Sequence, residues 1–283
     1  MTYTDFDLEL PGVRLRLRSH GDPEVLPVIC LPGLTANLTS FDALAAELQR
    51  DGRRVLALDL RGRGLSEATA PGSYGWTAHA GDVLAAADAI GAHRFDLVGW
   101  SMGGHVSMQV ARFAADRVRR LVLLDIAGPV ADPMAIAAIL RGSERLGTVY
   151  GSLEEYLSLV RSLGTVVPWS DNWIRYFEYE LAPVEGGFQA RTSREAALED
   201  LAYALEHDAR DNWPSLTMPV LLVRAARPVL PVGGFLVPEE LRDQFRREIL
   251  HAAVVEVQAN HYGIAFDRDA LAAIRGFLKP GKA

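Results

Sequence analysis

Short runs of apolar residues recur along the chain and alternate with longer stretches in which apolar positions return every three or four residues. The short runs are rich in Val, Ile and Leu, which is typical of strands buried on both faces of a parallel sheet. Strands are predicted at 13–18, 27–31, 55–60, 95–99, 121–125, 220–223 and 254–257, and helices at 41–50, 78–90, 102–115, 238–247 and 267–278. The alternation predicts repeated βαβ units, and therefore an α/β fold with a mostly parallel sheet flanked by helices.

The alternation breaks between about residues 128 and 213. This stretch contains several helix-like segments and no convincing strand, and capping-box patterns at 152–155 and 192–195 indicate helix starts. Its aromatic residues include Trp169, Trp173, Tyr176, Phe177 and Tyr179. These rings form either the core of a small helical domain or the wall of a pocket under a lid, and both can hold at once. We therefore predict a core of residues 1–127 and 214–283 and a helical cap, or lid, of residues 128–213.

Composition and charge narrow the class of protein. With 49% hydrophobic and 23% charged residues, the 283-residue chain is expected to be globular rather than disordered or coiled-coil. The net charge of −7 argues against a nucleic-acid partner, whose binding surface would be basic. The single cysteine, Cys30, favours a reducing compartment, and we expect neither a metal nor a cofactor. Because neither a signal peptide nor an apolar run of ~20 residues is visible, a cytoplasmic protein without a membrane partner is expected.

A strand predicted at 95–99 runs directly into the sequence Gly99-Trp-Ser101-Met-Gly103, and a predicted helix follows. A G-x-S-x-G pattern between a strand and a helix is typical of a nucleophile elbow, in which a sharp turn exposes the serine hydroxyl. Gly99 and Gly103 remove side chains that would collide across this turn. The helix N-terminus supplies partial positive charge where an oxyanion develops. The motif therefore predicts Ser101 as a catalytic nucleophile, with Trp100 pointing into the core beneath the elbow.

The chain resembles the α/β-hydrolase family over essentially its whole length. The stretch 30–35 follows the third strand where the family usually has His-Gly, and 59–66 is similar to its D-x-R-G-x-G-x-S turn. Asn260-His261-Tyr262 follows the last strand, where the family has its catalytic histidine. The resemblance implies a cap inserted after the sixth strand of the fold. Serine as nucleophile distinguishes the chain from the epoxide hydrolases and haloalkane dehalogenases of the same fold, which have Asp there.

A narrower resemblance links the chain to bacterial catabolic hydrolases, such as (E)-2-(acetamidomethylene)succinate hydrolase and lactonase-like enzymes. It rests on the elbow, on an acid that ends the strand after the elbow, on Arg224 at the end of the following strand, and on the Asn-His-Tyr sequence at 260–262. This resemblance implies small-molecule catabolism and does not name a substrate.

A serine hydroxyl needs a base that takes its proton. The chain has seven histidines: His20, His79, His93, His105, His207, His251 and His261. His105 lies one helical turn after Ser101 and is interpreted as an ordinary helix residue, whereas His251 lies at the amino end of the last strand, at the wrong edge of the sheet. His261 follows the carboxyl end of that strand, where ligands bind in open α/β sheets, and it is the predicted base.

The acid of the triad is where the sequence departs from the family pattern. The family most often has Asp in the loop after the next-to-last strand, but here this loop, 224–238, contains no carboxylate. Glu239, just beyond it, is typical of an acid in the first turn of a helix. The fold also uses an acid at the end of the preceding strand, where this chain has Asp125. An unpartnered carboxylate there would be costly, so Asp125 is favoured as the residue that orients His261; alternatively, it caps the strand or pairs with an arginine.

The position of the residues in the family implies an oxyanion hole formed by the backbone N–H groups of Leu34 and Met102. Thr35 and Asn37 either bind substrate or satisfy backbone groups of their own loop. The arginines of the turn at 59–66 are expected to brace neighbouring loops. Six cap arginines are expected mostly on a solvated face, one or two of them able to bind a substrate carboxylate: Arg141, Arg145, Arg161, Arg175, Arg191 and Arg194.

The residues together predict an enzyme, a serine hydrolase that cleaves a small-molecule carboxylic ester, lactone or activated amide through an acyl-enzyme. In this hypothesis Ser101 attacks the carbonyl, His261 transfers the proton and Asp125 holds the imidazole. The same fold also hosts C–C bond hydrolases, cofactor-free dioxygenases and non-enzymatic ligand receptors, and the sequence leaves these alternatives open. The expected partner is a small-molecule substrate, and a homodimer is left open.

Overall fold

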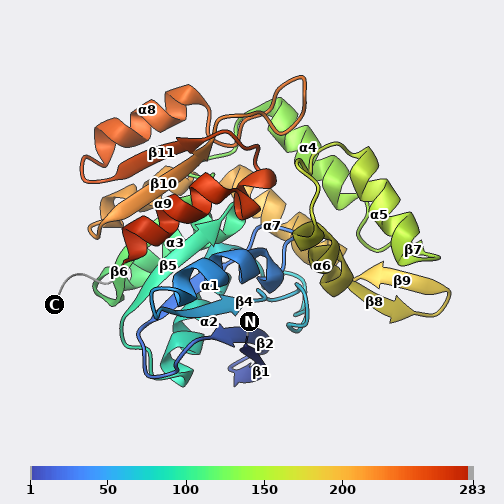
Figure 1. Cartoon of the computed structure of the whole chain (residues 1–283), viewed down its shortest axis with the longest axis horizontal. Coiled ribbons are helices and arrows are strands. Elements are labelled where there is room, and N and C mark those ends of the chain that lie inside the picture. The colour runs from blue at the N-terminus through green and yellow to red at the C-terminus, as the bar shows by residue number, and fades with distance from the viewer. Residues whose placement is uncertain (1, 280–283) are drawn as a thin grey trace.

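The apolar runs of the sequence form neighbouring strands of one large sheet in the computed structural model, which describes residues 2–279 (Figure 1). The strands of this sheet are β1 (Tyr3–Leu10), β2 (Val13–His20), β3 (Pro27–Leu31), β4 (Arg54–Leu58), β5 (Phe95–Trp100), β6 (Val118–Leu124), β10 (Val220–Ala225) and β11 (Ala253–Val257). Their order is β1-β2-β4-β3-β5-β6-β10-β11. The β1–β2 and β2–β4 pairs are antiparallel and the other pairs are parallel, which confirms the predicted α/β class.

Helices cover both faces of this sheet (Figure 1). They are α1 (Asp42–Gln49), α2 (Trp76–Ala89), α3 (Met102–Ala114), α8 (Glu239–Glu248) and α9 (Arg268–Leu278), with short 3-10 helices η1 (Leu38–Phe41), η2 (Ala115–Arg117) and η4 (Gly263–Phe266). Within residues 2–279, none of the helices combines the length and the apolar character that a bilayer crossing requires.

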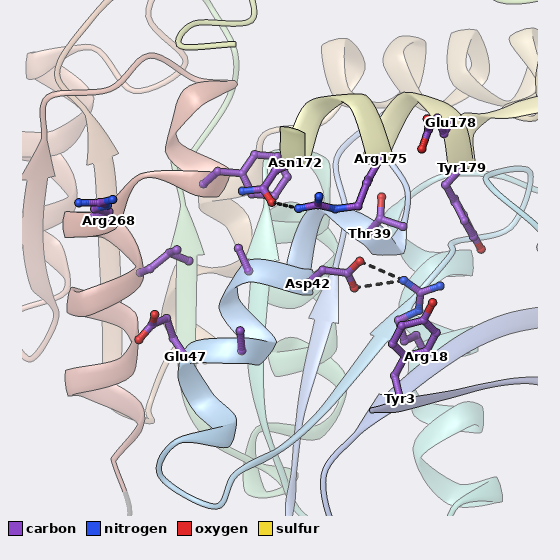
Figure 2. Close-up of a pocket in the computed structure, with 14 residues that line it drawn as sticks. Tyr3, Arg18, Thr39, Asp42, Glu47, Asn172, Arg175, Glu178, Tyr179 and Arg268 are labelled. Carbon is purple, nitrogen blue, oxygen red and sulfur yellow. Dashed lines mark hydrogen bonds and ion pairs between the residues drawn. The ribbon is translucent and has the colours of Figure 1, made fainter. Parts of the chain in front are cut away.

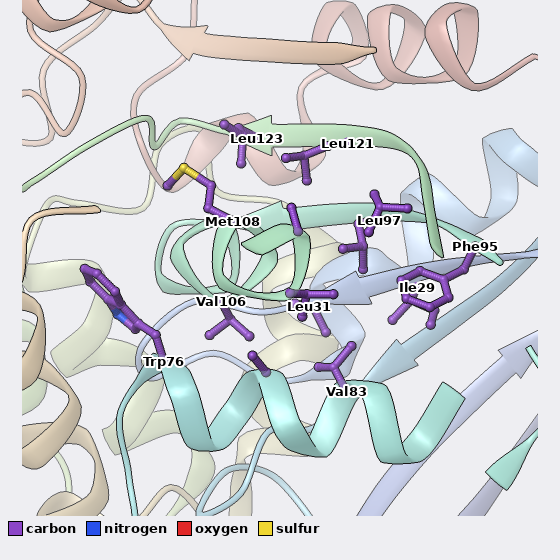
Figure 3. Packing of buried hydrophobic residues seen from close by; sticks show 14 of the residues in the cluster. Ile29, Leu31, Trp76, Val83, Phe95, Leu97, Val106, Met108, Leu121 and Leu123 are labelled. Atoms are coloured by element: carbon purple, nitrogen blue, oxygen red, sulfur yellow. The ribbon is translucent and has the colours of Figure 1, made fainter. Parts of the chain in front are cut away.

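Alternate residues of the central strands divide the core into two clusters, because successive side chains of a strand point to opposite faces. Leu97 of β5 belongs to the cluster that includes residues of α2 and α3, whereas Val98 belongs to the one that includes residues of α1 and α9. Figure 3 shows the first cluster, in which Val83 of α2 and Val106 of α3 pack near strand residues such as Leu97. Both faces of β5 are therefore buried, which holds its carboxyl end, and the elbow that follows, in place.

The N-terminal strand β1 is an element that the sequence interpretation missed. Its apolar residues alternate with acids, a pattern of period two that indicates a strand. The acids pair across the hairpin with basic residues of β2: Asp5 lies opposite Arg18 in the register, and their side chains form an ion pair of 2.8 Å. The acidic residues therefore belong to a paired edge strand.

The segment between β6 and β10 forms the cap. Its helices are α4 (Pro133–Ser143), α5 (Leu153–Ser162), α6 (Asp171–Glu180) and α7 (Arg194–Glu206), and its strands are β7 (Val149–Tyr150), β8 (Leu181–Val184) and β9 (Gly187–Ala190). The three strands form a small antiparallel sheet in the order β7-β9-β8, so the prediction of a purely helical insert was wrong. The sequence pattern did not predict these strands because each has at most four residues and β8 contains Pro183. The Gly186-Gly187 pair, with φ angles of 85° and 147°, is the hairpin signal that the sequence does contain.

The end of the cap also differs from the predicted boundary after residue 213. The 3-10 helix η3 (Ala209–Ser215) spans this boundary, and its residues Ala209 and Trp213 lie in the core cluster of α2 and α3. The Trp213 indole donates a hydrogen bond of 2.7 Å to the carbonyl oxygen of Ala127. The chain therefore returns to the core before η3, not after it.

The loop between β10 and α8, residues 226–238, packs on the cap helix α4. Val229 and Leu236 share a small apolar cluster with Ala135 and Ala138 of that helix. The backbone N–H of Phe235 donates a hydrogen bond of 2.9 Å to the carboxylate of Asp132, the residue that caps α4. This loop therefore supports one side of the cap.

A buried carboxylate of the core connects to the other side of the cap. Asp59, after β4, accepts hydrogen bonds from the Tyr179 hydroxyl of α6 at 2.7 Å and from the backbone N–H groups of Leu38 and Leu65 at 2.7 and 2.9 Å. Burial raises the pKa of Asp59 to about 6, although these three donors and Arg18 favour the ionised form. The folded protein therefore binds this proton more tightly than the unfolded chain, and the contribution of Asp59 to stability falls as the pH rises through about 6.

Tyr179→Phe is expected to lower the free energy of unfolding by about 1–2 kcal/mol at pH 8, because the ionised Asp59 loses a hydrogen-bond donor. At pH 5 the carboxyl group is mostly protonated in the folded protein, so the loss should be smaller. Urea unfolding of both proteins at the two pH values measures the difference. Tyr150→Phe is the matched control, since that hydroxyl donates to the Arg145 carbonyl, which does not titrate. An equal loss for Tyr179→Phe at both pH values would contradict the pairing with an ionised Asp59.

Candidate active site

Ser101 lies on the sharp turn between β5 and α3. Its backbone has φ 55° and ψ −124°, in the left-handed region that side chains rarely adopt. A Cβ atom on Gly99 would lie 2.3 Å from the carbonyl oxygen of Gly103, and one on Gly103 would lie 2.0 Å from that of Leu31. Both positions therefore exclude any side chain, for the reason that the sequence motif suggested. The turn presents the serine at the carboxyl edge of the parallel strands.

Asp125 and His261 meet at the same edge of the sheet. Asp125 directly follows β6, the neighbour of β5, and one of its carboxylate oxygens lies 2.8 Å from Nδ1 of His261. The other oxygen accepts a hydrogen bond of 2.9 Å from the backbone N–H of Ala225. Both side chains are buried, with exposed fractions of 3% for Asp125 and 7% for His261. Asp125 also has a positive φ of 52°, so the backbone turns sharply as the strand ends.

The other acids and histidines considered in the sequence lie away from this pair. Glu239 is mostly exposed and faces Arg242 at 3.9 Å. His105 is buried in α3, where its Nε2 lies 2.9 Å from the Gly128 carbonyl oxygen, and burial lowers its pKa to about 4. His251 is exposed, just before β11. The structure thus pairs His261 with Asp125 at the sheet edge where Ser101 lies, and it places Glu239, His105 and His251 away from this pair.

The loop after β3 forms the wall opposite the elbow. A Cβ atom on Gly33 would lie 3.2 Å from the Ser101 Cβ, so this backbone passes directly beside Ser101. Among residues 2–279, the N–H groups of Leu34 and Met102 donate to no protein acceptor, which leaves both available to a ligand. The guanidinium of Arg63, fully buried, donates a hydrogen bond of 2.9 Å to the Leu34 carbonyl oxygen.

Arg63 and Arg61 brace loops, as expected for the turn that contains them. Arg63 pairs with Asp200 of α7 at 2.6 Å, and Arg61 pairs with Asp82 of α2 at 2.6 Å. Asn37 caps η1 through its own loop, because its side-chain oxygen accepts from the backbone N–H of Thr39 at 3.0 Å. Of the polar loop residues considered, Thr35 is the one that borders the cavity described next.

Ser101 and His261 border a small cavity of about 50 Å³ beneath the cap. Its remaining lining residues are Gly33, Leu34, Thr35, Ala36, Trp100, Ile139, Gly142, Ser143, Tyr176 and Tyr262. A second compartment of about 30 Å³ shares Thr35, Gly142, Tyr176 and Tyr262 with the first and extends deeper into the cap. We call the first the serine compartment and the second the cap compartment. Tyr176 is therefore a pocket residue, whereas Tyr179 serves the contact between cap and core.

Trp100 does not simply fill the core beneath the elbow. Its indole N–H donates to the His261 carbonyl oxygen at 3.2 Å, and its ring lies 5.8 Å from the imidazole. Asn260 also supports the loop of His261, a role that the sequence did not reveal. Its side chain donates to the Thr165 carbonyl oxygen of the cap at 2.7 Å and accepts from the Gly263 N–H at 2.8 Å. Both residues hold the loop that carries His261.

A larger groove of about 780 Å³ lies between α1, α6 and α9 (Figure 2). Its lining contains none of the predicted site residues. Arg18 pairs there with Asp42 at 3.0 Å, and Arg175 donates to Asn172 at 2.6 Å. The size of a cavity therefore does not identify the site here. The elbow does.

The cap arginines divide into one buried residue and five others. Arg145 is buried, with an exposed side-chain fraction of 8%, and borders the cap compartment. Arg141, Arg161, Arg175 and Arg194 are exposed, and Arg191 is half-buried. Among residues 2–279, no group of three or more His, Cys, Asp or Glu side chains is arranged to hold a metal ion.

Comparison with known proteins links part of this chain to a known fold. A family model described as the alpha/beta hydrolase fold matches residues 27–156. The serine hydrolase-like protein of Danio rerio is 33% identical over 126 residues, which cover 44% of this chain and 38% of that protein. 2-Hydroxymuconate semialdehyde hydrolase of Pseudomonas sp. strain CF600 is 35% identical over 127 residues, which cover 42% of this chain and 43% of that protein.

The solved structure of E-2-(acetamidomethylene)succinate hydrolase superposes with a TM-score of 0.87 at 24% identity, over 99% of this chain and 100% of that one. This match confirms the resemblance that the elbow and the Asn-His-Tyr sequence indicated, and at this identity it shows a shared fold. The alignments with the two sequence relatives span less than half of the length of either protein.

Proposed function

Since this chain is an α/β-hydrolase-fold protein with relatives named as hydrolases, we propose that it is a serine hydrolase acting on a small molecule. The substrate is a carboxylic ester, a lactone or an activated amide. The observation that carries the proposal is the hydrogen bond of 2.8 Å between Asp125 and Nδ1 of His261, beside a serine held in a strained turn that borders the same cavity as His261. Such an arrangement is needed for nucleophilic catalysis and has no evident structural purpose.

In the proposed mechanism, the Ser101 hydroxyl attacks the substrate carbonyl as Nε2 of His261 takes its proton. The Asp125 carboxylate holds the proton on Nδ1, which leaves Nε2 free to accept, and stabilises the imidazolium that forms. The N–H groups of Leu34 and Met102 donate to the developing oxyanion. His261 then protonates the leaving group, and water activated by the same imidazole hydrolyses the acyl-enzyme.

A fluorophosphonate probe and a short-chain aryl ester test the proposal together. The probe should modify Ser101, identified by peptide mass spectrometry, and the protein should turn over p-nitrophenyl butyrate with a burst of nitrophenol if deacylation is slow. Labelling blocked by prior incubation with the ester would link both events to one site. A folded protein that is neither labelled nor active on any ester, lactone or aryl amide would refute the proposal.

The size of the two compartments leads to a further prediction. The compartments, of about 50 and 30 Å³, are both much smaller than a cavity of ~150 Å³ that holds a benzene molecule, so they offer room for only a short acyl chain. We therefore expect p-nitrophenyl butyrate and hexanoate to be hydrolysed with at least ~10-fold larger kcat/KM than the laurate. Initial rates across the C4–C12 series measure this preference. A profile that keeps rising to C12 would show that the cap opens to admit long chains.

Hydrolysis of a C–C bond is a second candidate, and the similarity to 2-hydroxymuconate semialdehyde hydrolase favours it. A serine–histidine–aspartate site can serve either reaction, so the substrate decides between them. Loss of absorbance of a vinylogous diketone acid, measured beside the ester assay, separates the two. Turnover of the diketone with no ester hydrolysis would favour the C–C reaction.

A further inference from the structure

The walls of the two compartments contain few charges. Among the described residues that line them, one is an arginine, Arg145, and none is a lysine, an aspartate or a glutamate. The cap compartment is otherwise bordered mainly by apolar and aromatic side chains, such as Val160, Leu163 and Trp173. The charge that a substrate meets there therefore depends on how Arg145 is engaged.

Arg145 is engaged by protein groups on several sides. It forms an ion pair of 2.5 Å with Glu180, the last residue of α6, whose exposed side-chain fraction is 1%. Its Nε donates to the Tyr156 hydroxyl at 2.8 Å, which in turn donates to the second Glu180 oxygen at 2.8 Å. Its other N–H groups donate to the Gly142 carbonyl oxygen and, at 3.3 Å, to the Thr35 hydroxyl. Protein acceptors thus engage four of the five N–H groups of the guanidinium, and Glu180 cancels its charge.

We propose that the pocket is built for a neutral, apolar acyl group and rejects an acyl group that ends in a carboxylate. This inference rests on the serine-hydrolase function proposed above and names the class of its substrate. A substrate carboxylate entering the pocket would lose its hydration, find four of the five N–H groups of Arg145 already engaged, and lie close to the buried Glu180 charge, which neutralises Arg145. An alkyl or aryl group meets none of these costs and gains apolar contacts.

A matched pair of substrates measures the preference. Phenyl 4-methylpentanoate and monophenyl succinate have acyl chains of the same shape, because the terminal isopropyl group replaces a carboxylate. We expect kcat/KM to be at least ~100-fold larger for the neutral ester in the native protein. The blank for each substrate is the Ser101→Ala variant, which corrects for spontaneous hydrolysis assisted by the neighbouring carboxylate.

Three variants test whether the Arg145–Glu180 pair sets this preference. Glu180→Gln leaves the Arg145 charge uncancelled, so the ratio should shift toward the succinate ester by at least ~10-fold, mainly through a lower KM. Glu178→Gln, on the same helix but exposed, is the matched control and should leave the ratio unchanged. The double variant Arg145→Met/Glu180→Gln removes both charges and should retain the neutral preference, which keeps the test valid if Glu180→Gln is poorly folded.

The outcomes distinguish a failure of this inference from a failure of the serine-hydrolase function on which it rests. If the native protein hydrolyses neither ester and Ser101 resists the fluorophosphonate probe, the hydrolase function fails. If it is labelled but hydrolyses the succinate ester as well as the neutral one, the hydrolase function stands and the neutral pocket is refuted. A strong neutral preference that Glu180→Gln leaves unchanged would also overturn the role given to the Arg145–Glu180 pair.

Discussion

Ser101→Ala should abolish labelling by a fluorophosphonate and reduce kcat for ester hydrolysis on the order of 10⁴-fold or more. The loss is this large because the variant retains the pocket and the N–H groups beside it but has no atom that can form the acyl-enzyme. Alanine removes one oxygen and leaves the turn intact, so the free energy of unfolding should change by less than about 1 kcal/mol. Stopped assays with p-nitrophenyl butyrate and thermal unfolding of the same samples measure both effects.

Ser162→Ala is a suitable control for the nucleophile. Ser162 ends α5, is exposed, and donates a hydrogen bond to the Leu159 carbonyl oxygen. Its replacement should change neither labelling nor turnover. Ester hydrolysis that persists in well-folded Ser101→Ala at more than a few per cent of the native rate would mean that another group performs the chemistry.

Asp125→Asn should lower kcat roughly 10²–10⁴-fold while leaving KM close to the native value. The amide can still accept from the Ala225 N–H, but its NH₂ group then points at Nδ1 of His261 and holds the imidazole in the wrong tautomer. Nε2 would carry the proton and could not take another from Ser101. Single-turnover kinetics with an activated ester test this directly, since the loss should appear in acylation.

Glu239→Gln is the matched control for the acid, because Glu239 lies just beyond the loop where the family more often has its aspartate. Its side chain is 71% exposed and lies 3.9 Å from that of Arg242. We expect native activity. Full activity of Asp125→Asn, or a comparable loss in Glu239→Gln, would remove Asp125 from the mechanism and leave the proposals for Ser101 and His261 standing.

The parts of the site that could be predicted from the sequence are those that local geometry controls. The elbow is recognisable because its residues are adjacent: a side chain at Gly99 would clash with Gly103 within the turn, and one at Gly103 would clash with Leu31 of the neighbouring strand β3. Asp125 and His261 are far apart in sequence, but each follows the carboxyl end of a parallel strand, and carboxyl ends of parallel strands meet at one edge. Because the loop 224–238 contains no acid, the sequence favours Asp125 as the residue that orients His261.

Other features depend on contacts that no short pattern contains. The sequence marked Arg145 as one of six equivalent cap arginines, and only the packing of α5 and α6 around it shows that it is buried and paired with Glu180. Asn260 reaches Thr165 across about a hundred residues of chain, and Trp100 reaches the backbone of His261 across the sheet edge. The cap strands were missed for a different reason, since strands of two to four residues carry too little periodicity to be recognised.

The loop after β10 has no acid to hold in place, and this frees it for a different use. Residues 226–238 contact α4 through Val229, Leu236 and the Phe235 N–H, while the Asp125–His261 pair needs only the Ala225 N–H at the base of the loop. The loop and α4 can therefore be regarded as one exchangeable module. A chimera that receives both segments from a relative would change the shape of the pocket roof while Asp125 and His261 keep their anchors, so this protein is a favourable starting point for the laboratory evolution of new specificities.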